Sequence, residues 1–77
     1  MIQGLLFFDK KNERYDIIFQ NGKYQGGLKC GDSFETLIEK DWISVEIEKV
    51  ADSWHFKSCD GSKLPERLNG MTVRMGS

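Results

Sequence analysis

The stretch WISVEIEK, residues 42–49, shows the clearest pattern in the chain. Its apolar residues Ile43, Val45 and Ile47 occupy every second position, and polar or charged residues fill the positions between them. A helix would spread these three residues around its circumference, because successive residues turn by about 100°. A strand places them on one face. The stretch therefore predicts a β-strand with one face buried.

The same alternation, broken by turn residues, continues on both sides of this stretch. Asn21-Gly22 is the strongest turn signal, because both residues tolerate positive φ. Residues 24–28 follow this turn, and their two glycines either bend the chain or let another backbone approach closely. We expect strands at residues 5–8, 14–20, 34–38, 42–49, 54–57 and 71–75.

Residues 59–70 carry signals that are typical of a helix rather than a strand. Ser62 can cap a helix, Pro65 suits a first turn, and Asn69-Gly70 can end one. Leu64 and Leu68 lie four positions apart, as on one helix face. These features predict one brief helical or 3₁₀ turn near residues 63–69.

Five to six short antiparallel strands with tight connections predict an all-β fold. The chain of 77 residues has room for one core, so we expect a single domain over residues 1–77. A small, strongly curved sheet avoids exposed edges by closing on itself. We expect an SH3-like barrel, and the alternatives are an open meander or a small OB-type barrel.

Composition and charge argue against several classes of protein. Eleven basic and 12 acidic residues give a net charge of −1, whereas a dedicated duplex-DNA binder usually carries a basic excess. The apolar run of residues 5–8 is too short for a signal peptide or a membrane helix. We therefore expect a cytoplasmic protein with no membrane contact. Cys30 and Cys59 fit that compartment as free thiols, and a disulfide between them is the alternative.

The glycine-rich segment GGLKCGD, residues 26–32, invites comparison with a phosphate-binding loop. Such a loop needs Lys followed by Ser or Thr at the start of a helix. Here Lys29 precedes Cys30, and the residues after the segment alternate as a strand. We therefore interpret the segment as structural. Its glycines bend the chain, Gly31 adopts a conformation that other residues resist, and Asp32 accepts hydrogen bonds from local amides.

Catalytic and metal-binding patterns are weak in this sequence. Cys30 as a nucleophile needs a base, and the alternation places the single histidine, His55, on a solvated face. No CxxC or HxxxH spacing supports a zinc site with Cys59. Glu46 and Glu48 share the solvated face of their strand. We predict no enzymatic activity, no cofactor and no metal, and we interpret Cys30 as a small buried residue.

Aromatic rings near basic side chains are the best functional signal. Tyr24 and Trp42 lie at or beside turns, where a large ring stays partly exposed. Small β-barrels use such rings to grip extended peptides or to stack bases. The basic residues around the same loops are Lys10, Lys11, Arg14, Lys23 and Lys29. We expect another protein as the partner, bound by this surface and the 9–14 and 20–32 loops. A single-stranded nucleic acid is the alternative partner, and an end cover for the barrel is the alternative role of Trp42.

Several segments together resemble one bacterial family. They are RYDIIFQNGKYQGGLKCGDSFETLI, Trp42, VEIE, DSWHF and LNGMTVRM, and the most specific is residues 26–32 followed by Phe34 and Glu35. Over residues 4–75 the chain resembles the family called domain of unknown function 5348. The resemblance implies a compact β protein of Gram-positive bacteria, often linked with plasmids and phage-like elements. A small accessory or inhibitory factor would suit that context, and the resemblance implies no catalytic or binding residues.

Overall fold

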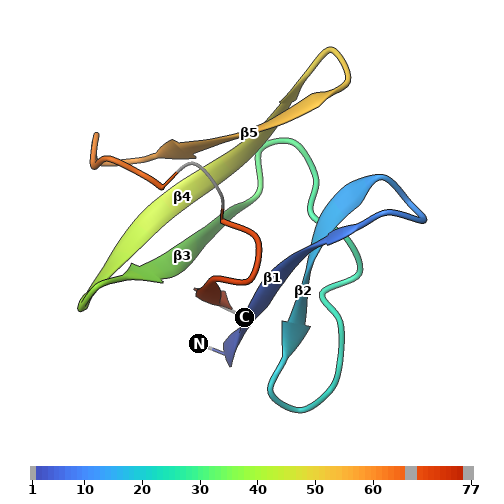
Figure 1. The fold of residues 1–77 in the computed structure, drawn as a ribbon, viewed down its shortest axis with the longest axis horizontal. Coiled ribbons are helices and arrows are strands. Elements are labelled where there is room, and N and C mark those ends of the chain that lie inside the picture. Colours follow the sequence, from blue (N-terminus) through green and yellow to red (C-terminus); the bar gives the residue numbers. More distant parts are fainter. Residues whose placement is uncertain (1, 66–67, 76–77) are drawn as a thin grey trace.

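A computed structural model describes residues 2–65 and 68–75. These residues form one twisted sheet of antiparallel strands (Figure 1). The strands are β1 (Ile2–Asp9), β2 (Arg14–Phe19), β3 (Ser33–Ile38), β4 (Asp41–Val50), β5 (Ser53–Ser58) and β6 (Thr72–Met75). Their order across the sheet is β2-β1-β6-β3-β4-β5. The prediction of an all-β fold of short antiparallel strands is confirmed.

The core lies on the inner face of this sheet. Val45 and Ile47 of β4 are fully buried, as the alternation of residues 42–49 predicts. The hydroxyl of Thr36, buried beside them, donates a hydrogen bond of 3.2 Å to the carbonyl of Thr72. This bond removes the cost of burying a polar group. The buried apolar residues are Leu6, Ile17, Leu28, Phe34, Val45, Ile47, Leu68 and Val73.

The sheet is open, with β2 at one edge and β5 at the other, so the closed SH3-like barrel is not confirmed. Side chains join the two edges instead. The ring of Tyr15 on β2 meets Trp54 and Phe56 of β5 edge to face, with centroids 6.4 and 4.9 Å apart. The indole Nε1 of Trp54 also donates a hydrogen bond of 3.1 Å to the carbonyl of Glu13.

The physical reason for the open sheet is that residues 23–28 already occupy the free side of β2. The backbone of Tyr24 forms an isolated bridge with Ile18, and the glycines that follow keep the segment irregular. Three amide-to-carbonyl hydrogen bonds of 2.8–2.9 Å hold it there: Phe19 to Lys23, Gln25 to Ile17 and Leu28 to Tyr15. The backbone groups that could have paired β2 with β5 are therefore used within the chain.

The brief helical turn predicted near residues 63–69 is not confirmed. Residues 66–67 lie outside the described residues, and the described residues on either side, 61–65 and 68–70, contain no helix. Leu64 and Leu68 both pack against the core, and neither lies in a helix. In the part of the chain that the structure describes, we find no helix with the length and apolar character needed to span a membrane.

Candidate functional site

The glycine-rich segment, residues 26–32, is held by one buried carboxylate. Asp16, 4% exposed, accepts hydrogen bonds at Oδ1 from the amides of Gly26 (3.1 Å), Gly27 (2.9 Å) and Ile17 (2.8 Å). Gly26 and Gly27 both have positive φ, 96° and 99°, which lets consecutive amides point at one acceptor. A phosphate-binding loop needs such amides free for its ligand. Here both glycine amides donate to Asp16, so the segment has the local structural role that we predicted for its glycines.

The other end of the segment forms a turn and a bulge that start β3. The amide of Asp32 donates to the carbonyl of Lys29 at 3.0 Å, and Gly31 takes a φ of 96° inside this turn. Gly31 then donates to the carbonyl of Ile47, and the amide of Ile47 donates to the carbonyl of Asp32. Two residues thus oppose one, as in a β-bulge. The carboxylate of Asp32 accepts the Lys29 amide at 2.8 Å, as predicted.

Cys30 is exposed at the tip of this turn, so its predicted burial is wrong. The turn points position 30 away from the core, because Gly31 and Asp32 on its C-terminal side pair with β4. Cys59 is exposed as well. His55 is exposed on β5, as the alternation predicts. Among residues 2–65 and 68–75, no three His, Cys, Asp or Glu side chains gather in a way that could hold a metal ion.

Among residues 2–65 and 68–75, Tyr24 is the most exposed large hydrophobic residue, at 60%. Its ring meets that of Phe7 edge to face, with centroids 5.8 Å apart. Arg14 lines a depression of about 380 Å³ with both rings and with Asp9 and Asp16. The predicted neighbours Tyr24 and Arg14 therefore lie together, on the outer face of β1 and β2.

Asp9 organises the β1–β2 connection beside this depression. Its carboxylate accepts hydrogen bonds from the side-chain amide of Asn12 (2.8 Å) and the backbone amide of Lys11 (3.1 Å). The side-chain hydrogen bond from Asn12 is the main cause that lowers the pKa of Asp9, and nearby Arg14 adds to it. The Arg14 Nε lies 4.0 Å from the same carboxylate. The negative charge of Asp9 and the positive charge of Arg14 therefore compensate each other.

Trp42 occupies a different part of the outer face. The guanidinium carbon of Arg74 lies 4.1 Å from its ring centroid, and Arg74 Nε pairs with Glu35 Oε1 at 2.9 Å. Strands β1, β6 and β3 separate the Trp42 strand from β2, on whose edge Tyr24 lies. The structure therefore does not bring the two predicted rings into one groove.

The predicted lysines are spread over two connections of the fold, β1–β2 and β2–β3. Lys10 and Lys11 lie between β1 and β2, Lys23 lies in the turn after β2, and Lys29 lies in the turn before β3. All four are exposed. Acidic residues share these loops, among them Glu13 next to the first pair. The described loops thus offer separate positive charges rather than a continuous basic stripe.

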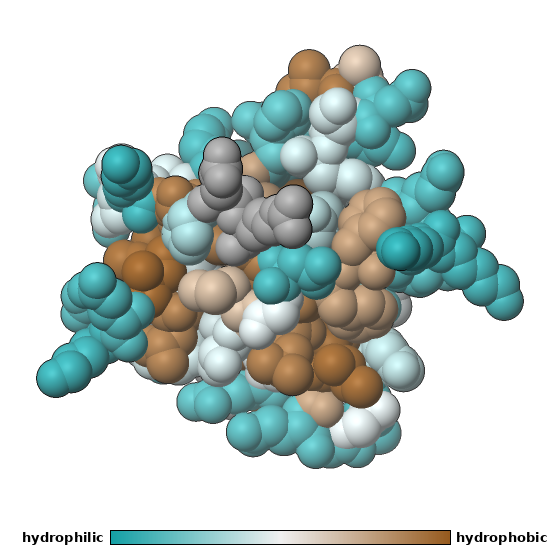
Figure 2. All heavy atoms as spheres, viewed as in Figure 1, coloured by the Kyte–Doolittle hydropathy of each residue, from teal (hydrophilic) through white to brown (hydrophobic). Residues whose placement is uncertain are grey.

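Our sequence reasoning missed an apolar surface on the outer face of β1 and β2. Tyr24, Ile18 and Leu5 follow one another across three neighbouring segments, and Phe7 lies two residues along β1 from Leu5. Leu5 is 49% exposed. We call Leu5, Phe7, Ile18 and Tyr24 the outer apolar patch. Figure 2 shows apolar side chains at the surface over these strands.

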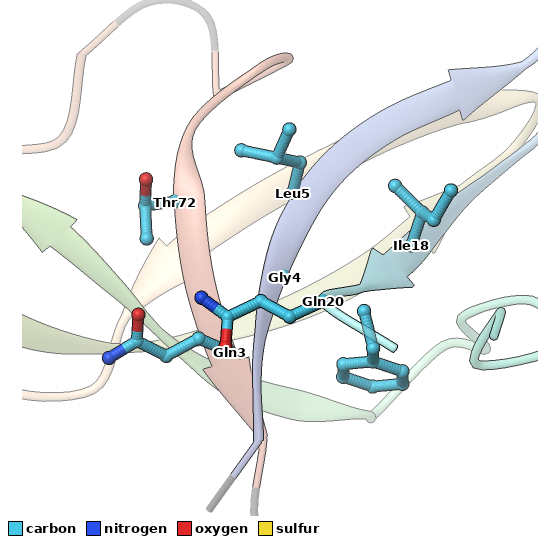
Figure 3. A pocket seen from close by; sticks show the side chains of 7 residues that line it. Gln3, Gly4, Leu5, Ile18, Gln20 and Thr72 are labelled. Atoms are coloured by element: carbon cyan, nitrogen blue, oxygen red, sulfur yellow. The ribbon is translucent and has the colours of Figure 1, made fainter. Parts of the chain in front are cut away.

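A depression of about 430 Å³ adjoins this patch at Leu5 and Ile18. In Figure 3, Leu5 and Ile18 rise from neighbouring strands on the same side of the sheet. The uncharged side chains of Gln3, Gln20 and Thr72 line the depression around them. The outer apolar patch could have been predicted from the run Leu5-Leu6-Phe7-Phe8. A strand with four consecutive apolar residues must present apolar side chains on both faces.

Comparison with known proteins identifies the family. The model of the family described as Domain of unknown function (DUF5348) matches residues 4–75. The chain belongs to this family. The crystal structure of a protein from Ruminococcus gnavus, a structural genomics target, is similar to this DUF5348 chain, with 37% sequence identity and a TM-score of 0.81. The match covers 95% of this chain and 99% of that chain. No curated protein matches the chain.

The resemblance inferred from the residues is thereby confirmed over the same range, 4–75. The family is described only as a domain of unknown function, so the match assigns no activity to this chain. Among the described residues of this DUF5348 chain, the outer apolar patch adjoins one depression, and Arg14 lines a second depression with Tyr24.

Proposed function

We propose that this DUF5348 domain is a non-enzymatic protein-binding module that contacts its partner through the outer apolar patch. The observation that carries the proposal is the exposure of Leu5 (49%) and Tyr24 (60%) within one contiguous set of apolar side chains. Removing apolar surface from water is the main driving force of protein association. It contributes about 25 cal/mol per Å² of apolar surface buried.

The polar groups around the patch suit a protein partner. Gln3, Gln20 and Thr72 line the depression beside Leu5 and Ile18. Amide and hydroxyl groups of this kind form hydrogen bonds with a partner's backbone at the rim of an interface. They do not neutralise phosphate charge. Apolar side chains of the partner enter the depression of about 430 Å³, and the polar rim fixes their orientation.

We further propose that the protein is a small accessory or inhibitory factor in the cytoplasm of a Gram-positive bacterium, encoded on a plasmid or phage-like element. This part of the proposal rests on the family resemblance. A rigid sheet that carries an exposed apolar patch suits such a role, because it can bind a partner without a large ordering cost.

Affinity capture from a Gram-positive lysate, followed by binding measurements with the purified captured protein, tests the proposal. Leu5→Lys places a charge in the patch, and Val50→Lys is the matched control, because Val50 is an equally exposed strand residue, at 58%, on β4. We expect Leu5→Lys to weaken binding at least about tenfold. Val50→Lys and Trp42→Ala should bind as the wild type does. Equal binding by all variants would overturn the proposal.

A single-stranded nucleic acid is the second candidate partner, and one observation favours it. The exposed ring of Tyr24 lies in a depression with Arg14, which is the combination that stacks a base and pairs with its phosphate. Asp9 and Asp16 line the same depression, and their negative charges repel a phosphate. Titration of a fluorescent oligo(dT) at rising salt separates the candidates. Phosphate-driven binding weakens steeply with salt, and apolar contact with a protein does not.

A further inference from the structure

The depression of about 380 Å³ beside Tyr24 combines exposed aromatic rings with unbalanced charge. We call it the charged depression. Two carboxylates and one guanidinium line it, so their formal charges sum to −1. Its rings belong to the outer apolar patch as well. The full lining is Phe7, Asp9, Arg14, Asp16, Tyr24 and Gly26.

Asp16 reaches the charged depression with one carboxylate oxygen that has no protein partner. Its Oδ1 accepts three backbone amides at 2.8–3.1 Å, but no hydrogen bond or ion pair from the described residues reaches its Oδ2. Asp16 is 4% exposed. In the described part of the chain, Arg14 Nε is the one fully buried polar side-chain atom of this kind without a hydrogen-bond partner. The Oδ2 of Asp16 therefore contacts solvent, and it does so at the depression that Asp16 lines.

Arg14 does not supply the counter-charge for this oxygen. Its Nε lies 4.0 Å from the Oδ2 of Asp9, and within residues 2–65 and 68–75 no ion pair of that length joins it to Asp16. The guanidinium lies against Gly27, where a Cβ would come within 2.6 Å of it. The charge of Asp16 is thus left without a paired cation. A buried carboxylate attracts a cation more strongly than an exposed one, because water screens the charges less.

The rings of Phe7 and Tyr24 are also open to a cation. Tyr24 is 60% exposed, and the two rings meet edge to face. A cation within about 6 Å of the face of such a ring is attracted to its π-electrons. Nowhere in the described ranges does an ammonium or guanidinium lie over either ring. Both tryptophans already hold a cation of their own chain, in the pairs Lys49–Trp54 and Arg74–Trp42.

We propose that the charged depression binds a lysine side chain of the protein partner, with its ammonium at Asp16 Oδ2 and its stem against Phe7 and Tyr24. The inference rests on the proposed function, because both rings belong to the outer apolar patch. An ammonium fits better than a guanidinium, since an arginine fork pairs with two acceptors and Asp16 offers one. The amides of Gly26 and Gly27 keep their bonds to Oδ1, so the glycine-rich segment keeps its structure.

Amide chemical-shift titration of the ¹⁵N-labelled domain with Nα-acetyl-lysine methylamide tests the site without the partner. The matched probe is the norleucine derivative, which keeps an apolar stem and lacks the ammonium. We expect the lysine probe to shift the amides of Phe7, Asp16 and Tyr24. It should bind at least about tenfold more tightly than the norleucine probe, because it adds a charge-assisted hydrogen bond and a cation–π contact.

Two variants test the role of the Asp16 charge. Asp16→Asn keeps a carbonyl oxygen for the three amides and removes the charge, so it should abolish the preference for the lysine probe. Asp32→Asn is the matched control, because that carboxylate accepts the exposed amide of Lys29 and does not line the depression. It should leave the preference unchanged. The same difference between the two variants, about tenfold, should appear in binding to the captured partner.

The comparison of probes on the wild-type protein does not depend on whether any variant folds. Equal affinity for the lysine and norleucine probes would overturn the proposal. So would tighter binding of Nα-acetyl-arginine methylamide, shifts at Phe7 and Tyr24 caused by inorganic phosphate, or equal behaviour of the Asp16 and Asp32 variants. Failure of the proposed function is distinguishable. If Leu5→Lys leaves partner binding unchanged while the preference for the lysine probe persists, the proposed function fails and the cation site stands.

Discussion

At the scale of single residues, the Asp16 carboxylate accepts the amides of Gly26 and Gly27, as an anionic ligand does in a phosphate-binding loop. Its Oδ1 accepts three backbone amides while the residue is almost fully buried. The alternation of β2 placed Asp16 on the outer face, and it does lie there. Its burial could not be predicted, because the residues that cover it, Gly26 and Gly27, lie ten and 11 positions away along an irregular segment.

Asp16→Ala should lower the free energy of unfolding by about 2–4 kcal/mol, because three amides lose a charged acceptor and those of the glycines lie in a partly buried site. Asp32→Ala is the matched control. It removes a carboxylate that accepts one exposed amide, that of Lys29, and should cost about 1 kcal/mol or less. Urea denaturation followed by tryptophan fluorescence measures both. Equal losses for the two variants would contradict the role assigned to Asp16.

Gly26 and Gly27 share a positive φ but differ in their surroundings. A Cβ at Gly27 would lie 2.6 Å from the Arg14 guanidinium, and a Cβ at Gly26 would meet nothing within 4 Å. Both Ala variants should lose about 1–2 kcal/mol from backbone strain. Gly27→Ala should lose more, and the excess should disappear in an Arg14→Ala background. An excess that persists in the double variant would show that Arg14 is not its cause.

At the scale of elements, the start of β1 lies very close to the end of its neighbour β2 at Gly4. A Cβ at Gly4 would overlap the carbonyl oxygen of Ile18 on the neighbouring strand. Because that atom belongs to the backbone, it cannot move aside as a flexible side chain does. Gly4→Ala should therefore destabilise the domain by about 1–3 kcal/mol, the usual cost of overpacking. Gln3→Ala, at the exposed neighbouring position, should change the melting temperature little. Similar melting temperatures for both variants would contradict this close approach.

The strands themselves were largely predictable from the sequence. The alternation of residues 42–49 marks β4 because its buried and solvated faces differ in polarity, and the same holds for Phe34 and Thr36 on β3. The first strand was harder to interpret, since residues 5–8 are apolar on both faces. The predicted helical turn illustrates a different difficulty. Leu64 and Leu68 have helical spacing and both pack against the core, yet neither lies in a helix.

At the scale of the whole molecule, closure of the sheet is a long-range property that local patterns do not contain. The sequence indicates turns and strands, but it does not show that residues 23–28 occupy the edge of β2. This covering leaves Tyr15, Trp54 and Phe56 to join the two edges through ring contacts. The composition of the candidate site also depends on pairing between segments that are distant in the sequence. The placement of Tyr24 and Arg14 beside the loops was predictable, but their neighbours Leu5 and Ile18 became visible only through the pairing of β1 with β2.

The central claim is that this DUF5348 domain binds another protein through the outer apolar patch. Amide chemical-shift mapping tests it most directly, with ¹⁵N-labelled domain titrated with the captured and purified partner. We predict the largest shifts at Leu5, Phe7, Ile18 and Tyr24, and little change in the glycine-rich segment, residues 26–32. The largest shifts in residues 29–32 around Cys30, with an unchanged patch, would contradict the claim.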